Sequence, residues 1–175
     1  MRIKARLFAV VCLALPLPGW ACDLALVLAV DVSGSVDAKE YRIQMDGLAA
    51  GLRARIVMDA LISQAAHVTL IQWSGSSRQR QSLAWTEMRN ERDVLAFADA
   101  VAEDPRIWRN FSTAIGEALE LSARVLQDVP HCARKVVDVS GDGVSNEGIA
   151  PGDMRAVMAV QGVIVNALAI ETDAT

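Results

Sequence analysis

Apolar runs of strand length alternate with helical patterns along most of this 175-residue chain. Residues 24–30 form an almost unbroken apolar run that ends at Asp31, which is typical of a central parallel strand covered on both faces. Further strands are expected at residues 68–73, 81–85, 136–139 and 163–170. Residues 81–85 follow a polar turn with no intervening helix, so they predict a short antiparallel edge strand.

Helical patterns fill the intervals between these runs. Asp37 and Glu40 have the spacing of a capping box and open a helix through Tyr41, Met45 and Leu48. Other helices are expected at residues 56–62, after Asn90, from Ile115 and at residues 151–162. This alternation predicts a single α/β domain with a doubly wound, mainly parallel, Rossmann-like sheet and right-handed crossovers.

The first 21 residues have the pattern of a secretory signal peptide. Basic residues precede the apolar run 7–15, and two prolines and a glycine follow it. The run is far shorter than the roughly 20 residues that span a bilayer, so no transmembrane anchor is expected. Cleavage after Ala21 would leave residues 22–175 as a periplasmic or secreted bacterial domain. A minor alternative is lipid attachment at Cys22, although Gly19 and Trp20 match a lipoprotein signal poorly.

Composition narrows the function classes. The chain is 53% hydrophobic and 22% charged, which excludes a disordered or fibrous protein. Its formal charge of −4 becomes −7 without Arg2, Lys4 and Arg6, and such a surface disfavours nucleic acid as a partner. No stretch of the sequence has the spacing of a Cys/His zinc module.

Residues with oxygen-bearing side chains follow several of the predicted strands and precede one of the predicted helices. Asp31, Ser33 and Ser35 lie on one turn, Thr113 precedes the helix from Ile115, and Asp142 follows the strand at 136–139 between two glycines. In an open α/β sheet the carboxyl ends of the strands form the ligand edge. Three hydroxyls and two carboxylates suit a hard cation such as Mg²⁺. A cation held mainly by neutral oxygens would accept an acidic side chain from a partner protein, so the pattern predicts cation-dependent adhesion.

This arrangement resembles the von Willebrand factor type A domain, whose metal-ion-dependent adhesion site combines D-x-S-x-S, a threonine and an aspartate. The resemblance covers about residues 23–172 and is closest to exported bacterial type A proteins of uncharacterised role, through residues 24–36, 137–143 and 165–170. It implies a protein-binding module rather than an enzyme. It also implies that Mg²⁺, or alternatively Mn²⁺ or Ca²⁺, is the cofactor, with metal ligands Asp31, Ser33, Ser35, Thr113 and Asp142.

Two features depart from the family pattern. Phe111 occupies a position where glycine is common, which predicts a less open second loop. The sequence also ends at Thr175, before the strand and helix with which such domains normally finish, so we expect an incomplete C-terminus with an uncovered sheet edge.

Other interpretations of these residues remain open. The hydroxyls could be helix caps and residues 141–143 a simple turn, which would leave a type A scaffold without metal. A less favoured alternative is a phosphatase-like enzyme with Asp31 as nucleophile. Such enzymes usually have a second acid two residues on or a nearby lysine, whereas this chain has Ser33. A nucleotide-binding Rossmann site is excluded because no glycine-rich fingerprint follows the first strand.

Five further side chains carry structural expectations. His67 and His131 flank strands and show no partner pattern, so they are interpreted as surface or strand-entry residues, and Trp73 and Trp85 are interpreted as packing residues. Asp138 interrupts an apolar strand, and we expect a structural pairing with an arginine or with backbone donors.

The two cysteines outside the signal segment suggest a disulfide. Cys22 lies nine residues before Asp31, and Cys132 lies ten before Asp142. If the two strands are parallel neighbours with both aspartates at one end, the cysteines meet at the other. A Cys22–Cys132 bond would stabilise the fold by about 2–4 kcal/mol.

Overall fold

A five-stranded sheet forms the centre of the molecule, in the order β3-β2-β1-β4-β5. The computed structural model describes residues 22–109 and 111–169. The strands are β1 (Leu24–Asp31), β2 (His67–Trp73), β3 (Gln79–Glu87), β4 (Arg134–Gly141) and β5 (Val163–Ala169). Neighbouring strands are parallel except for the β2–β3 pair, which is antiparallel. The predicted doubly wound α/β sheet is therefore confirmed, although the antiparallel strand is longer than expected.

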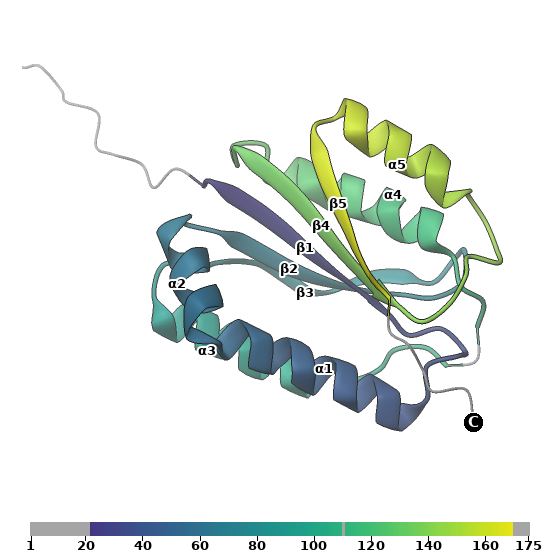
Figure 1. Ribbon diagram of the computed structural model, residues 1–175, viewed down its shortest axis with the longest axis horizontal. Helices are drawn as coiled ribbons and strands as arrows, with labels where there is room; N and C mark the ends of the chain where they lie inside the picture. The colour runs from purple at the N-terminus through teal and green to yellow at the C-terminus, as the bar shows by residue number, and fades with distance from the viewer. Residues whose placement is uncertain (1–21, 110, 170–175) are drawn as a thin grey trace, which may run out of the picture.

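Helices cover both faces of this sheet (Figure 1). One face carries α1 (Ala38–Arg53), α2 (Arg55–Ser63) and α3 (Glu91–Glu103). The other carries α4 (Ile115–Val125), the short 3₁₀ helix η1 (Leu126–Asp128) and α5 (Pro151–Val160). None of the helices in the described part of the chain has the length and apolarity needed to cross a membrane.

The pleat of β1 explains why its sequence is apolar without alternation. Leu24, Leu28 and Val30 belong to the core beneath α1 and α3, whereas Ala25 and Val27 belong to the core beneath α4. Successive side chains of a strand point to opposite faces, and both faces of β1 are buried. This double burial fixes β1 at the centre of the sheet and its carboxyl end at the candidate site.

The predicted start of α1 is confirmed in detail. The Asp37 carboxylate accepts hydrogen bonds from the backbone N–H groups of Lys39 and Glu40, at 2.7 and 2.8 Å. The Glu40 carboxylate accepts in return from the backbone N–H of Asp37, at 2.7 Å. This capping box begins the helix directly after the loop that carries Ser33 and Ser35.

Asp138 on β4 has a different partner from the one expected. The side-chain amide of Asn166 on β5 donates to its carboxylate at 2.7 Å, in place of an arginine or a backbone group. The reason is that β5 is the edge strand among the described residues, so this part of the sheet face is partly open and a neutral amide is a sufficient partner for the carboxylate. The signal segment 1–21 and the end of the chain from residue 170 lie outside the described residues, so the expectations for both remain predictions.

Candidate metal site

Three loops meet at the carboxyl edge of the central strands. They are residues 32–37 after β1, residues 104–109 and 111–114 between α3 and α4, and residues 142–150 after β4. Strands β1 and β4 are parallel neighbours with Val30 opposite Ser140, so their last residues reach the same edge. The topology therefore brings together loops that are more than 100 residues apart in sequence.

The five predicted ligand residues converge at this edge. The hydroxyls of Ser33 and Ser35 lie 3.1 Å apart, and the Ser35 hydroxyl donates to Asp142 Oδ1 at 2.6 Å. A Cβ placed on Gly143 would lie 3.5 Å from Thr113 Oγ1 and 3.8 Å from Ser35 Oγ, so both hydroxyls face the same point. Oxygens from all three loops thus surround one small volume.

Asp31 lies beneath this group with one oxygen satisfied and one free. Its Oδ1 accepts from the backbone N–H of Ser33 at 2.7 Å. Its Oδ2 is buried and has no hydrogen-bond partner among the described residues. A buried carboxylate oxygen without a partner is energetically costly, and a bound cation would relieve that cost. The donor set and this orphaned oxygen fit a divalent cation.

Burial dominates the electrostatics of Asp31. Desolvation raises the pKa of its carboxyl to about 6, and the negative charge of Asp142 adds to the rise. Hydrogen bonds from Ser33 and the positive charge of Arg106 act in the opposite direction. Two acids share a site that is short of positive charge, and a cation would supply it.

The alternative of ordinary helix capping does not fit the hydroxyls. The N-cap of α1 is Asp37, beyond Ser33 and Ser35. The N-cap of α4 is Ala114, which makes no side-chain capping hydrogen bond, and the first N–H of that helix, on Ile115, donates to the Ser145 hydroxyl at 3.3 Å. The side chains of Ser33, Ser35 and Thr113 are therefore left for the shared site.

Sequence reasoning missed the residues that hold the loops in place. The Arg106 guanidinium donates to the backbone carbonyls of Val32 and Ser33, at 3.1 and 2.8 Å. Asn146 Oδ1 accepts from the backbone N–H of Thr113 at 3.0 Å, and the Asn146 N–H donates to the Thr113 carbonyl at 2.9 Å. Burial lowers the pKa of Arg106. Both residues lie in irregular segments with no periodicity, so no sequence signal indicated their roles.

Two further glutamates brace the loop after β4. Glu117 on α4 accepts from the backbone N–H of Ile149 at 3.0 Å. Glu147 accepts from the hydroxyl and the backbone N–H of Ser76, at 2.9 and 3.2 Å, and these hydrogen bonds lower its pKa. These contacts tie the Asp142 loop to α4 and to the β2–β3 turn.

Phe111 contacts the loop after β1 with its backbone. Its carbonyl accepts from the Gly34 N–H at 2.7 Å, while the Arg78 guanidinium lies 3.6 Å above its ring. The ring thus packs against Arg78, and the second and first loops are joined by a main-chain hydrogen bond.

A family model described as "Protein of unknown function (DUF1194)" matches residues 21–175. The chain belongs to this family. No curated protein matches the sequence significantly. The family assignment therefore states the relationship of the chain but names no activity.

Solved structures identify the fold. Proximal thread matrix protein 1 from the mussel byssus, solved with a zinc-occupied MIDAS motif, aligns with a TM-score of 0.65 and 18% identity, covering 87% of this chain and 37% of that one. The pilus adhesin SpaC from Lactobacillus rhamnosus GG aligns with a TM-score of 0.61 and 15% identity, covering 83% and 24%. A von Willebrand factor type A protein from Catenulispora acidiphila gives 0.60 and 20%, covering 86% and 34%. The chain therefore has the type A fold and spans between a quarter and just over a third of those chains.

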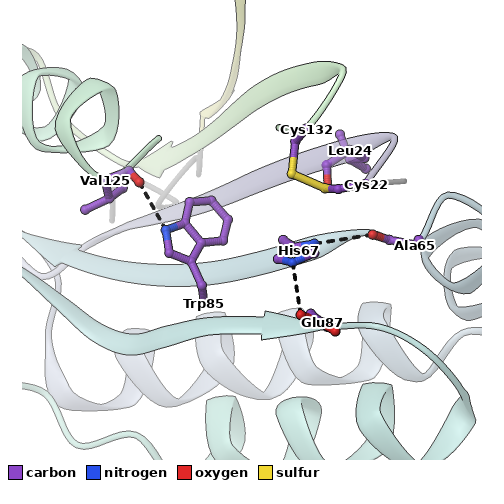
Figure 2. The surroundings of a disulfide bond; sticks show 8 residues. All are labelled: Cys22, Leu24, Ala65, His67, Trp85, Glu87, Val125 and Cys132. Atoms are coloured by element: carbon purple, nitrogen blue, oxygen red, sulfur yellow. Dashed lines mark hydrogen bonds and ion pairs between the residues drawn. A yellow bond between two sulfur atoms is a disulfide. The ribbon is translucent and has the colours of Figure 1, made fainter. Parts of the chain in front are cut away.

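The remaining predictions for this type A domain have mixed outcomes. Trp73 is fully buried, and Trp85 packs over the sheet with its indole N–H donating to the Val125 carbonyl at 3.1 Å, so their packing roles are confirmed (Figure 2). Cys22 and Cys132 form the predicted disulfide. His67 begins β2 and His131 is exposed, as interpreted, and their rings lie edge to face with centroids 5.3 Å apart, a pairing that the sequence did not indicate.

Proposed function

We propose that this protein is a divalent-cation-dependent protein-binding module of the adhesion type. In this proposal Asp31, Ser33, Ser35, Thr113 and Asp142 hold Mg²⁺, with Mn²⁺ or Ca²⁺ as alternatives. The observation that carries it is the buried Oδ2 of Asp31, which has no hydrogen-bond partner in residues 22–109 and 111–169 and lies below hydroxyls that reach Asp142 through a 2.6 Å hydrogen bond.

The chemistry of the donor set supports a hard cation. All five side chains offer oxygen and none offers nitrogen or sulfur, which suits Mg²⁺, Mn²⁺ and Ca²⁺. The byssus protein described above was solved with zinc in its MIDAS motif. That relative supports occupation of this kind of site by a divalent ion, and the oxygen donors here favour magnesium.

An acidic side chain of a partner is the ligand that such a site would capture. Three of the five proposed ligands are neutral hydroxyls, which are weaker donors than carboxylates, so the bound cation can accept a further carboxylate. Phe111 and Val144 flank the site and expose 38% and 85% of their surfaces. A partner that places a carboxylate at the cation would also cover these two apolar groups, which favours a protein over a small anion.

An Asp31 nucleophile is disfavoured by the position of its side chain. Asp31 is fully buried, and one oxygen is held by the Ser33 N–H. A nucleophilic carboxylate must reach the atom it attacks. This buried carboxylate lies beneath the hydroxyls, where it can support them and a bound cation but cannot reach a substrate.

Export from the cytoplasm agrees with these features. Residues 1–21 carry the signal-peptide pattern, and a disulfide is typical of proteins in oxidising compartments. Because the Cys22 sulfur is bonded to Cys132, the structure disfavours lipid attachment at that sulfur. A periplasmic or secreted location is therefore proposed.

Calorimetric titration with magnesium tests the site. We expect wild type to bind one ion, and Asp142→Ala to lose at least about 100-fold in affinity because a charged ligand disappears. Asp128→Ala removes an exposed acid on η1, away from the site, and should bind like wild type. Equal binding by wild type and Asp142→Ala would remove the proposed metal site and leave the metal-free scaffold.

Paired peptide arrays test the partner chemistry. Each acidic peptide is matched with a copy in which Glu or Asp is replaced by its amide, and binding of the protein is measured with magnesium and with EDTA. The proposal predicts peptides that bind only in the acidic form and only with magnesium. Binding that is indifferent to EDTA would contradict it.

A further inference from the structure

A second cluster of metal-ligating side chains lies at the amino edge of the same sheet. Cys22 precedes β1, His67 begins β2, and His131 and Cys132 precede β4. One ligand atom from each of the four residues lies within 4.8 Å of all the others. Figure 2 shows His67 directly beneath the Cys22–Cys132 bond. The residues come from three separate segments of the sequence, and the three strands bring them together because they begin at the same edge of the sheet.

The four side chains form a graded path from solvent to the interior. Cys22 and Cys132 are almost completely buried, the His67 side chain is 14% exposed, and His131 lies at the surface. The two histidines line a hollow of about 330 Å³ next to Glu87. A cation that enters this hollow would therefore meet the two imidazoles first, with the buried sulfurs next to them.

The donor set matches zinc in type, and zinc bond lengths set the distances that its members must reach. Two thiolates and two imidazoles are a common tetrahedral zinc set. Zinc bond lengths imply ligand-to-ligand distances of roughly 3.3–3.8 Å in such a tetrahedron. The most distant pair here would need to approach by about 1 Å, which a small side-chain rotation provides.

The surroundings of His67 have the outer partners of a metal-binding histidine. The Ala65 carbonyl lies 3.4 Å from Nδ1, and the Glu87 carboxylate lies 3.5 Å from Nε2 (Figure 2). Metal-bound histidines usually donate their second ring N–H to a carbonyl or carboxylate. Whichever nitrogen faces the metal, the other therefore has an acceptor nearby.

We propose that Cys22, His67, His131 and Cys132 form a redox-controlled zinc site that alternates with the disulfide. A dithiol reductant gives two electrons and two protons to the Cys22–Cys132 bond and becomes a disulfide itself. The two thiols then bind zinc with the two imidazoles and release two protons. A disulfide oxidant then takes two electrons from the two thiolates and two protons from solvent and becomes a dithiol, while the Cys22–Cys132 bond re-forms and the zinc ion is released.

The backbone keeps the cluster together when the disulfide opens. The Ala133 N–H donates to the Cys22 carbonyl at 2.9 Å, and the Arg134 N–H donates to the Asp23 carbonyl at 3.1 Å. These bonds continue the β1–β4 ladder beyond Leu24 and Arg134. Zinc and the disulfide are thus alternative cross-links between the same two strand starts.

Cobalt and zinc titration of the oxidised and reduced protein tests this site. The reduced protein, freed of dithiothreitol under anaerobic conditions, should bind one more equivalent of zinc than the oxidised protein. With cobalt it should develop thiolate-to-metal charge-transfer absorption, which the oxygen site cannot produce. Equal zinc uptake by both forms, or no such absorption from a folded reduced protein, would overturn the proposal.

Matched variants separate this site from the oxygen site. His131→Ala should weaken zinc binding by the reduced protein more than about tenfold, and Glu87→Gln by about tenfold, because even outer partners cost roughly 10–100-fold. Asp142→Ala should keep the thiolate absorption unchanged. If the reduced chain unfolds without metal, recovery of its native circular dichroism on adding zinc supports the site, and no recovery overturns it. Zinc binding that is unaffected by loss of His131 would also overturn it.

Discussion

The two edges of the sheet have opposite chemistry although the same strands build both. Asp31 and Asp142 gather with hydroxyls where β1 and β4 end, whereas Cys22 and Cys132 gather with histidines where these strands begin. The eight residues of β1 separate the two clusters by about 26 Å, at roughly 3.3 Å per residue. Parallel pairing brings distant residues together at both edges, and the side chains alone decide what each edge can bind.

Removing the disulfide tests whether the two edges are independent. Replacing both Cys22 and Cys132 with alanine should lower the free energy of unfolding by about 2–5 kcal/mol, because the bond closes a loop of 110 residues. Magnesium affinity should not change. Denaturant unfolding and calorimetry on the same samples check both statements, and a tenfold loss of magnesium binding would show that the edges are coupled.

The pH dependence of unfolding isolates the carboxyl edge. Because the pKa of Asp31 rises from 3.8 to about 6 on folding, the folded state holds this proton more tightly than the unfolded state. The ionised carboxylate therefore lowers the free energy of unfolding above pH 6, and this loss of stability disappears as the pH falls toward 4. In EDTA this contribution to the unfolding free energy is worth up to about 3 kcal/mol. Magnesium affinity should move the opposite way and weaken below about pH 6.

Asp31→Asn is the matched variant for this pH series. It keeps the shape of the side chain but has no proton to gain. Its unfolding curves in EDTA should lack the gain in stability between pH 7 and pH 5. An identical gain in the variant would assign the effect to another group.

Gly116 tests how the Asp142 loop is held against α4. A Cβ at Gly116 would overlap the backbone carbonyl of Ile149, so the helix and the loop must move apart. Gly116→Ala should cost about 1–3 kcal/mol of stability and weaken magnesium binding. Gly152→Ala, where a Cβ meets nothing within 4 Å, is the control. Equal effects from both changes would contradict this account of the loop.

Sequence reasoning succeeded where the chain is regular. The apolar run before Asp31 identified a doubly covered central strand, and residues after a parallel strand necessarily lie at one edge of the sheet. The same reasoning run backward from Asp31 and Asp142 placed Cys22 beside Cys132. Strand direction and register are thus the information that the pattern of apolar residues carries best.

Sequence reasoning failed for residues in irregular segments and for residues that meet only because their strands begin at the same edge of the sheet. Arg106 contacts the first loop from a segment with no repeating pattern. His67 meets His131 only because β2 and β4 lie on either side of β1, an order that local spacing does not encode. Asp138 accepts a hydrogen bond from Asn166 on β5, which is the edge strand among the described residues. A partly exposed carboxylate at such an edge does not need the charged partner that a fully buried one would need.

A crystal structure of the protein grown with Mn²⁺ tests the central claim most directly. Manganese gives an anomalous signal, so its position can be assigned without reference to the protein. We expect one anomalous peak between the side chains of Ser33, Ser35, Thr113 and Asp142, above Asp31. A well-ordered site with no peak there, with the five side chains unchanged, would contradict it.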